Sequence, residues 1–203
     1  MNPTKIQLSE DELALVQNGQ LLLTKNAIMD KAVEVMGVLH GQVKELLEQQ
    51  EPGLPDEVLA GSGKISKGEK YEGLPWVMLD YPRLFGKEDV FAVRTMFWWG
   101  NFFSITLHLS GRYKKMYQPV LLKNRMLLQE CNFYLCVSED EWRHDFASTN
   151  YVSLDQLDDQ AVTDILSVTH FCKLSVRIPL QMWNLSMTMT DTLYRAIFDS
   201  LKP

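Results

Sequence analysis

The chain has 203 residues, of which 46% are hydrophobic and 23% are charged. This hydrophobic content excludes an intrinsically disordered chain, and the length suffices for a buried core without disulfides or metals. The 20 Lys and Arg residues face 26 Asp and Glu residues, a net charge of −6, which argues against nucleic acid as a partner because phosphate binding needs clustered cations. We therefore expect a single globular domain over residues 1–203.

The N-terminus and the cysteines predict a cytoplasmic protein. The first residues lack the basic start and apolar run of a signal peptide, and no apolar run approaches the roughly 20 residues of a membrane helix. Cys131, Cys136 and Cys172 are an odd number of thiols, and the spacing of Cys131 and Cys136 on a predicted strand suits neither a shared zinc nor a mutual disulfide. We expect buried, reduced thiols, no metal and no cofactor.

Two helices are predicted near the N-terminus. The capping box Ser9-Glu10-Asp11-Glu12 predicts a helix to about Asn18. Apolar residues at steps of three and four then predict a long amphipathic helix over 26–50, and segment 20–23 either joins or separates the two. Gly37 and Gly41 cost this helix about 1 kcal/mol each relative to alanine, so we expect a close crossing with another element there.

Segment 51–75 is rich in glycine and proline and is predicted to be a long loop, either a lid or disordered. Its Gly61-Ser62-Gly63-Lys64 run matches a phosphate-binding loop only in part. Val58 stands where the first glycine should be, and Ile65 follows the lysine in place of Ser or Thr. A nucleotide site is therefore not expected here.

The centre of the chain predicts an antiparallel meander with strands over 76–81, 90–98 and 102–109. A two-residue turn would pair Arg94 with Leu107 and mix apolar and polar faces. A three-residue turn, 99–101, pairs Val93 with Leu107 and Arg94 with Thr106, which keeps one face apolar. We predict the second register.

The remaining pattern predicts a helix over 120–129 with Pro119 near its start, a strand over 133–137 and a short helix from the second capping box, Ser138–Glu141, to Phe146. An edge strand over 151–154, a helix over 159–168, a second edge strand over 172–182 and a final helix over 188–201 follow. The predicted fold is α+β: a mostly antiparallel sheet of four to six strands with the long N-terminal and C-terminal helices packed on one face.

One stretch carries a family resemblance. The run Arg94-Thr95-Met96-Phe97-Trp98-Trp99-Gly100-Asn101, with Leu107–Gly111 and Glu141-Trp142-Arg143-His144, resembles a group of uncharacterised bacterial proteins over about a third of the chain. The resemblance implies an intracellular bacterial origin, and it transfers neither an activity nor site residues.

The polar face of the predicted sheet is the first candidate site. Strand parity places Asp80, Arg94, Thr106 and His108 on it, with Tyr134, Lys173 and Arg177 joining if their strands belong to the same sheet. A carboxylate beside His108 suits acid–base catalysis, and Arg94 and Arg177 suit binding of an anion. The alternative is a solvated face decorated by cross-strand polar pairs.

Two further features bear on function. Trp99 at the hairpin turn is predicted to have few neighbours and so to anchor a protein partner or a second subunit. Glu141 and His144 have the spacing of a di-metal motif, but the second copy that such a site needs is missing.

Two functions therefore stand open. The first is a non-catalytic binding or interaction protein, with a small molecule or a protein as partner and a possible homo-oligomer. The alternative is an enzyme that acts on a small anionic substrate through His108, Asp80 and Arg94.

Overall fold

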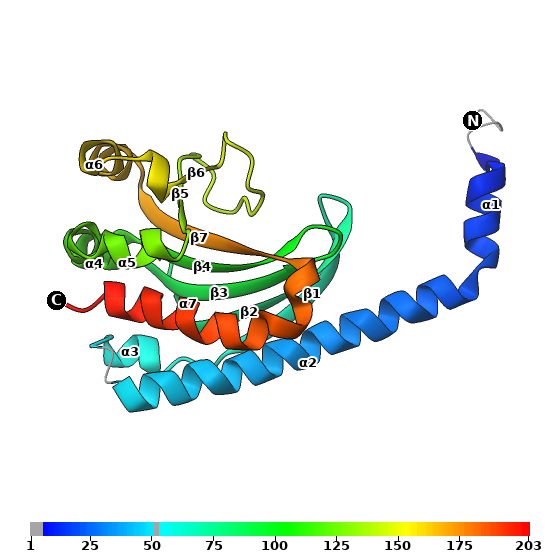
Figure 1. Ribbon diagram of the computed structural model, residues 1–203, viewed down its shortest axis with the longest axis horizontal. Helices are drawn as coiled ribbons and strands as arrows, with labels where there is room; N and C mark the ends of the chain where they lie inside the picture. The colour runs from blue at the N-terminus through cyan, green and yellow to red at the C-terminus, as the bar shows by residue number, and fades with distance from the viewer. Residues whose placement is uncertain (1–5, 51–52) are drawn as a thin grey trace.

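The computed structural model describes residues 6–50 and 53–203, which form one antiparallel sheet with helices packed against it (Figure 1). The seven strands lie in the order β1-β2-β3-β4-β7-β5-β6 and comprise β1 (Lys64–Tyr71), β2 (Leu74–Phe85), β3 (Val90–Trp98), β4 (Phe102–Ser110), β5 (Tyr134–Cys136), β6 (Tyr151–Ser153) and β7 (Phe171–Pro179). The helices are α1 (Glu10–Gln17), α2 (Gly19–Gln50), α3 (Asp56–Leu59), α4 (Gly111–Lys123), α5 (Arg125–Glu130), α6 (Asp159–Val168) and α7 (Ser186–Ser200), with 3-10 turns η2 (Leu154–Gln156) and η3 (Leu180–Leu185). The α+β class is confirmed, with seven strands in place of the predicted four to six.

The register of the central hairpin is the predicted one. Val93 lies opposite Leu107 and Arg94 opposite Thr106, and the turn spans residues 99–101. The three-residue turn therefore separates an apolar face from a mixed one, on which Arg94, Thr106 and His108 are polar while Met96 and Trp98 belong to a second, smaller hydrophobic cluster.

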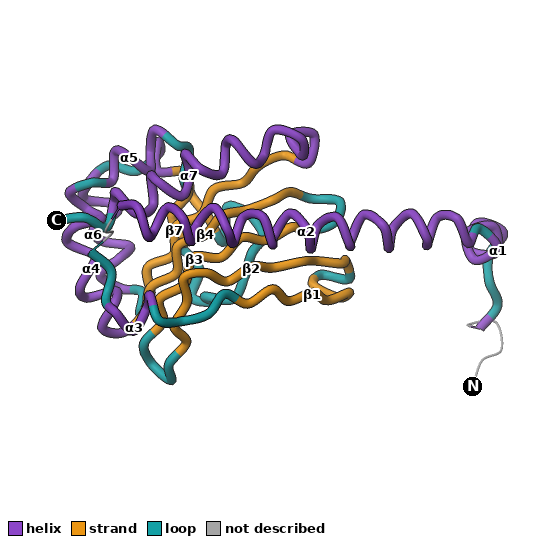
Figure 2. Tube along the Cα trace, turned by 90° about the horizontal axis from the view of Figure 1, so that it is seen from below, coloured by secondary structure: helices purple, strands orange, loops and turns teal. Residues whose placement is uncertain are grey.

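The main core lies between the apolar sheet face and the helices α2, α4 and α7 (Figures 1 and 2). Its sheet side is built by alternate residues of β3 and β4, and the polar Thr95 among them is satisfied by a 2.5 Å hydrogen bond to the Tyr194 hydroxyl of α7. The amphipathic stripe of α2 contributes the buried residues Met36, Leu39 and Val43. The long helix is thus held by burial along one face.

The two helix glycines do not mark a close crossing, so that prediction is wrong. A Cβ built on Gly37 or Gly41 would meet no atom within 4 Å. Both residues lie on the exposed side of α2. In the described structure no packing contact offsets the helix stability that these glycines lose relative to alanine.

The predicted loop over 51–75 is wrong over most of its length. Residues 51–52 lie outside the described residues, while α3 and the edge strand β1 occupy much of the remainder. β1 pairs antiparallel with β2 from Lys64 opposite Asp80 onward. An edge strand exposes most of its side chains, so its sequence resembles a polar loop.

Three other local predictions are wrong. Residues 142–146 do not form a helix, because Ser138 Oγ accepts from the Asp140 amide and Asp140 Oδ1 accepts from the Trp142 amide, which replaces a capping box. Pro119 lies inside α4, which begins at Gly111 and is capped by the Asp89 carboxylate through the Arg112 amide. β7 lies between β4 and β5 and ends at Pro179, so it is not an edge strand.

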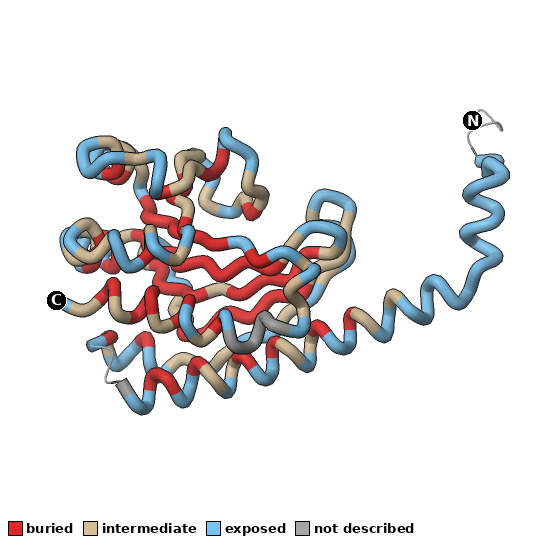
Figure 3. The backbone as a smooth tube through the Cα atoms, viewed as in Figure 1, coloured by how far each residue is buried: buried red, intermediate tan, exposed pale blue. Residues whose placement is uncertain are grey.

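The N-terminal part of the chain projects beyond the sheet (Figures 1 and 2). We call residues 10–24 the arm: it comprises α1, the bend at Asn18 and the beginning of α2. All residues from Ile6 to Thr24 are exposed, and the first buried residue of α2 is Met29 (Figure 3). In the described structure the arm buries none of its apolar side chains.

None of the described helices is both long enough and apolar enough to cross a membrane.

Candidate functional site

The polar residues predicted for the sheet face lie in one row. Asp80 is opposite Arg94, Arg94 is opposite Thr106, and Ser175 of β7 links Thr106 to Tyr134 of β5. The next row pairs His108 with Lys173. Side chains from five strands thus share the face opposite the main core.

Asp80 and Arg94 bind each other. The Arg94 guanidinium donates from Nε to Asp80 Oδ1 at 2.7 Å and from Nη2 to Asp80 Oδ2 at 3.2 Å. The two side chains are 8% and 12% exposed, so this is a largely buried bidentate pair. The Arg94 guanidinium, which the sequence predicts to bind an anionic substrate, is therefore already paired with Asp80.

A segment that we call the cover segment, residues 137–150, lies over this face (Figure 1). Lys173 Nζ donates to the carbonyl oxygens of Glu141, at 2.8 Å, and Arg143. The His144 amide donates to the Tyr71 hydroxyl at 2.7 Å, and the Phe146 ring packs on Tyr151 with a centroid distance of 4.7 Å. The polar face is therefore a buried layer and not the open, solvated face considered as the alternative.

His108 has Glu141 as its partner. Its Nε2 lies 2.8 Å from Glu141 Oε2, and its ring packs edge-on against Trp142 with the ring centroids 5.5 Å apart. On the outer side, His170 Nε2 lies 3.6 Å from Glu141 Oε1. One carboxylate therefore lies between a buried and an exposed imidazole. The sequence pattern pairs Glu141 with His144 on a predicted helix, but residues 141–146 are not helical and Glu141 binds His108 instead.

A hollow of about 530 Å³ opens beside Glu141. Trp142 and Phe85 supply apolar walls, while Lys87, Glu141 and His170 supply charge or hydrogen bonds. Its size is that of a small-molecule site. Because its ionisable groups carry both signs, the lining favours no single class of ligand.

The remaining predicted site residues lie apart from this cluster or are already paired. Thr106 Oγ1 is 2.7 Å from Ser175 Oγ, and both residues are buried. Arg177 is exposed at the other end of β7, where its guanidinium lies over the rings of Tyr134 and Phe146. The structure therefore brings His108 and Lys173 together and leaves Arg177 outside.

Burial lowers the pKa of His108 and lowers the pKa of His144 well below the ordinary 6.5. Below pH 6.5 the unfolded chain then binds protons that the folded chain does not, so acidification favours unfolding. Between its folded and unfolded pKa, such a histidine lowers stability by up to about 1.4 kcal/mol per pH unit of acidification, and the larger contribution comes from His144, whose pKa is lowered further. We expect urea unfolding to show lower stability at pH 5.5 than at pH 7.5, with a smaller difference for His144→Gln. An equal difference in both proteins would contradict the burial effect.

A second hollow, of about 520 Å³, lies where the arm meets the end of the sheet. We call it the arm hollow. The arm and the start of α2 contribute Leu15, Val16, Asn18, Gly19, Leu21, Leu22 and Lys25, and the sheet end contributes Glu69, Leu74, Pro75 and Trp99. Apart from the Lys25–Glu69 ion pair at 2.6 Å, its lining is mainly apolar.

Trp99 has more intramolecular contacts than predicted. It is half-buried, packs against the main core and has its ring centroid 6.4 Å from that of Phe97. Its amide donates to the Pro75 carbonyl at 3.0 Å. Trp99 is therefore a fixed wall of the arm hollow and not an unsupported tip.

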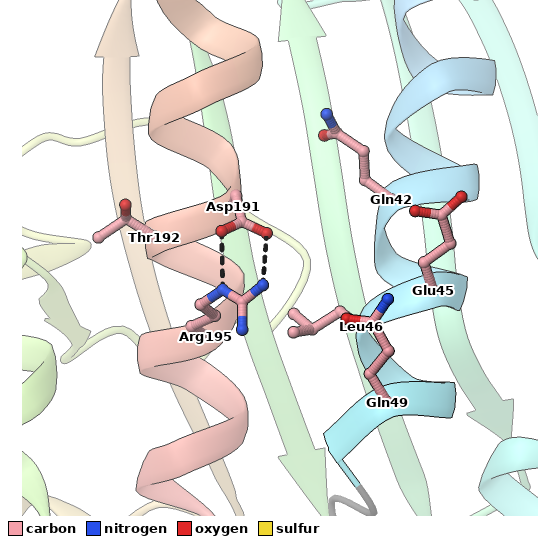
Figure 4. A pocket seen from close by; sticks show the side chains of 7 residues that line it. All are labelled: Gln42, Glu45, Leu46, Gln49, Asp191, Thr192 and Arg195. Carbon is pink, nitrogen blue, oxygen red and sulfur yellow. Dashed lines mark hydrogen bonds and ion pairs between the residues drawn. The ribbon is translucent and has the colours of Figure 1, made fainter.

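A third hollow, of about 430 Å³, lies between α2 and α7 on the helical side (Figure 4). Arg195 Nε of α7 donates to Asp191 Oδ2 at 2.7 Å, and Gln42 and Glu45 of α2 line the opposite side of the hollow. The Arg195 charge is thus balanced within its own helix.

No group of three His, Cys, Asp or Glu side chains suited to a metal ion occurs among residues 6–50 and 53–203. The described cysteines are free: Cys136 and Cys172 are buried and Cys131 is half-buried, and burial raises the pKa of all three thiols. High thiol pKa values disfavour nucleophilic chemistry at neutral pH.

Comparisons with protein-family models, with curated proteins and with solved structures find no match for this chain.

Proposed function

We propose that this protein is a non-catalytic interaction protein that binds a second copy of itself through the arm and the Trp99 end of the sheet. The observation that carries the proposal is the exposed apolar surface of the arm. Leu22 and Leu23 are 62% and 63% exposed, and Val16 is 68% exposed. Contiguous apolar surface of this kind marks a contact surface in a soluble protein.

The energetics of the arm support this proposal. α1 has eight residues, none of them buried, and isolated helices this short are marginal in water. Its capping box satisfies the first amides, with the Ser9 amide 2.7 Å from Glu12 Oε2, but it covers no apolar surface. A second protein surface would supply the missing burial.

The enzyme alternative receives less support from the geometry. It requires Asp80 to orient His108 and Arg94 to hold an anion, whereas Asp80 and Arg94 are bound to each other and His108 is bound to Glu141. The cover segment also buries these groups. We therefore interpret the polar row as a structural layer that fixes the cover segment.

Substitution of Leu22 by glutamate tests self-association. At micromolar concentration, light scattering after size exclusion should give the wild type twice the 23.4 kDa chain mass and give Leu22→Glu the single chain mass. A charge placed at a desolvated apolar contact costs several kcal/mol unless it is paired. The matched control is Val168→Glu, a similarly exposed apolar site on α6, which should remain dimeric.

A monomeric wild type at that concentration would contradict the proposal, as would a Leu22→Glu protein that stays dimeric. Far-UV circular dichroism of Val168→Glu should equal that of the wild type, and Leu22→Glu should lose no more than the helical signal of the arm, because neither side chain belongs to the core.

A further inference from the structure

We infer that the arm hollow of one copy is filled by α1 of a second copy, so that two chains exchange arms about a twofold axis. This inference rests on the proposed self-association and adds which segment occupies which surface. It is supported by the size of the hollow, by the distribution of apolar side chains on the arm and by charge.

The arm hollow has the size of a helical segment. Its volume is about 520 Å³. One turn of α-helix with side chains, 10–12 Å wide and 5.4 Å long, occupies roughly 500 Å³. In Figure 1 α2 runs past the end of the sheet and continues into the arm, and residues from both the arm and the sheet end line the hollow. The volume of the hollow therefore matches that of one helical turn.

The arm is apolar on more than one side, which favours a second copy over a foreign ligand. Leu15, Val16, Leu21 and Leu22 line the arm's own hollow, whereas Leu13 and Leu23 do not, although they are 47% and 63% exposed. A ligand seated in the hollow would leave Leu13 and Leu23 in water. An exchanged arm is itself enclosed by its partner, so both sets are covered.

The area available fits a specific dimer. Six large apolar side chains of the arm, Leu13, Leu15, Val16, Leu21, Leu22 and Leu23, are exposed. At ~100 Å² each, two arms offer on the order of 1,200 Å² of apolar surface. Specific protein interfaces begin at about this total area, and the walls of the hollow add to it.

Charge supports the same arrangement. The first turn of α1 carries Glu10, Asp11 and Glu12, all exposed. The strand that contributes Glu69 to the hollow also carries the exposed Lys67 and Lys70. An acidic helix start that enters beside this strand meets cations, which helps to select the partner's α1 over a neutral helix.

Cross-linking between two different variants tests the exchange. In a Cys131→Ser background, Leu13→Cys chains are mixed with tagged Pro75→Cys chains and treated with a short bismaleimide. The tag gives the mixed product its own mass. We expect at least tenfold more mixed product than for Leu13→Cys with tagged Val168→Cys, although position 168 is more exposed than position 75, because Val168 lies on α6, away from the arm (Figure 1).

The outcomes separate this inference from the proposed function. If light scattering shows a dimer but the Pro75→Cys and Val168→Cys mixtures give equal amounts of cross-linked product, the arm exchange is wrong and self-association still stands. A monomer would overturn both. Hydrogen exchange gives a second readout in case a cysteine variant fails to fold: amides of α1 should be protected in the wild type and unprotected in Leu22→Glu, and fast exchange in both would count against the exchange.

Discussion

Replacement of Asp80 by alanine is expected to lower the free energy of unfolding by about 3–5 kcal/mol, because it leaves a buried guanidinium without its carboxylate. Arg94 is 12% exposed at its side chain and makes two hydrogen bonds to Asp80. Urea unfolding followed by circular dichroism at pH 7.5 measures the change.

The double variant Asp80→Leu with Arg94→Met is the control for this prediction. It removes both charges and keeps apolar volume in their place, so most of the lost stability should return. If Asp80→Ala costs less than about 1 kcal/mol, the pair behaves like a solvent-screened surface bridge, and the buried polar layer described above is wrong.

The second large effect concerns the attachment of α2 to the sheet. Leu39 is 1% exposed and belongs to the main core, and its replacement by alanine should cost about 2–5 kcal/mol through lost burial and the cavity left behind. The neighbouring Val38 is 47% exposed, and Val38→Ala should stay within about 0.5 kcal/mol of the wild type. Thermal and urea unfolding of the two variants make a matched pair.

Equal losses for the two alanine variants would mean that α2 is not seated on the sheet by the face containing Met36 and Leu39. The arm would then also be misplaced, because it continues from α2 without an interruption after Gly19. The stability test therefore checks the geometry on which the arm hollow depends.

The central hairpin could be predicted from sequence to the residue because its information is local. Phe91, Val93 and Phe97 alternate with Ala92 and Arg94, and only an odd turn length aligns this pattern with that of the next strand. The same parity rule placed Asp80, Arg94, Thr106 and His108 on one face before their neighbours were known.

The cover segment could not be predicted, because the same residues support two local structures. Ser138 with Glu141 has the spacing of a capping box, yet Ser138 and Asp140 satisfy nearby amides in successive turns. What decides between them is distant: Lys173 and His108 bind Glu141 from β7 and β4. Single-sequence patterns do not contain that pairing.

The arm hollow was missed for a related reason. The sequence left open whether segment 20–23 joins or separates the two N-terminal helices; it lies within α2, and the break between the helices is at Asn18. The useful signal was the surplus of leucine on the arm, more than one stripe of a docked helix needs. The sequence predicts that Trp99 anchors a partner, but the arm residues that line the same hollow lie more than 70 positions away in the chain.

The borders of the sheet restrict how copies of this protein can join. One border is β1, with exposed lysines at positions 64, 67 and 70, and the other is β6, with only three residues. Like charges and a short ladder both oppose strand-by-strand extension, the route by which sheets grow into fibrils. A dimer held by helix contacts, such as the arm exchange proposed above, needs neither border of the sheet.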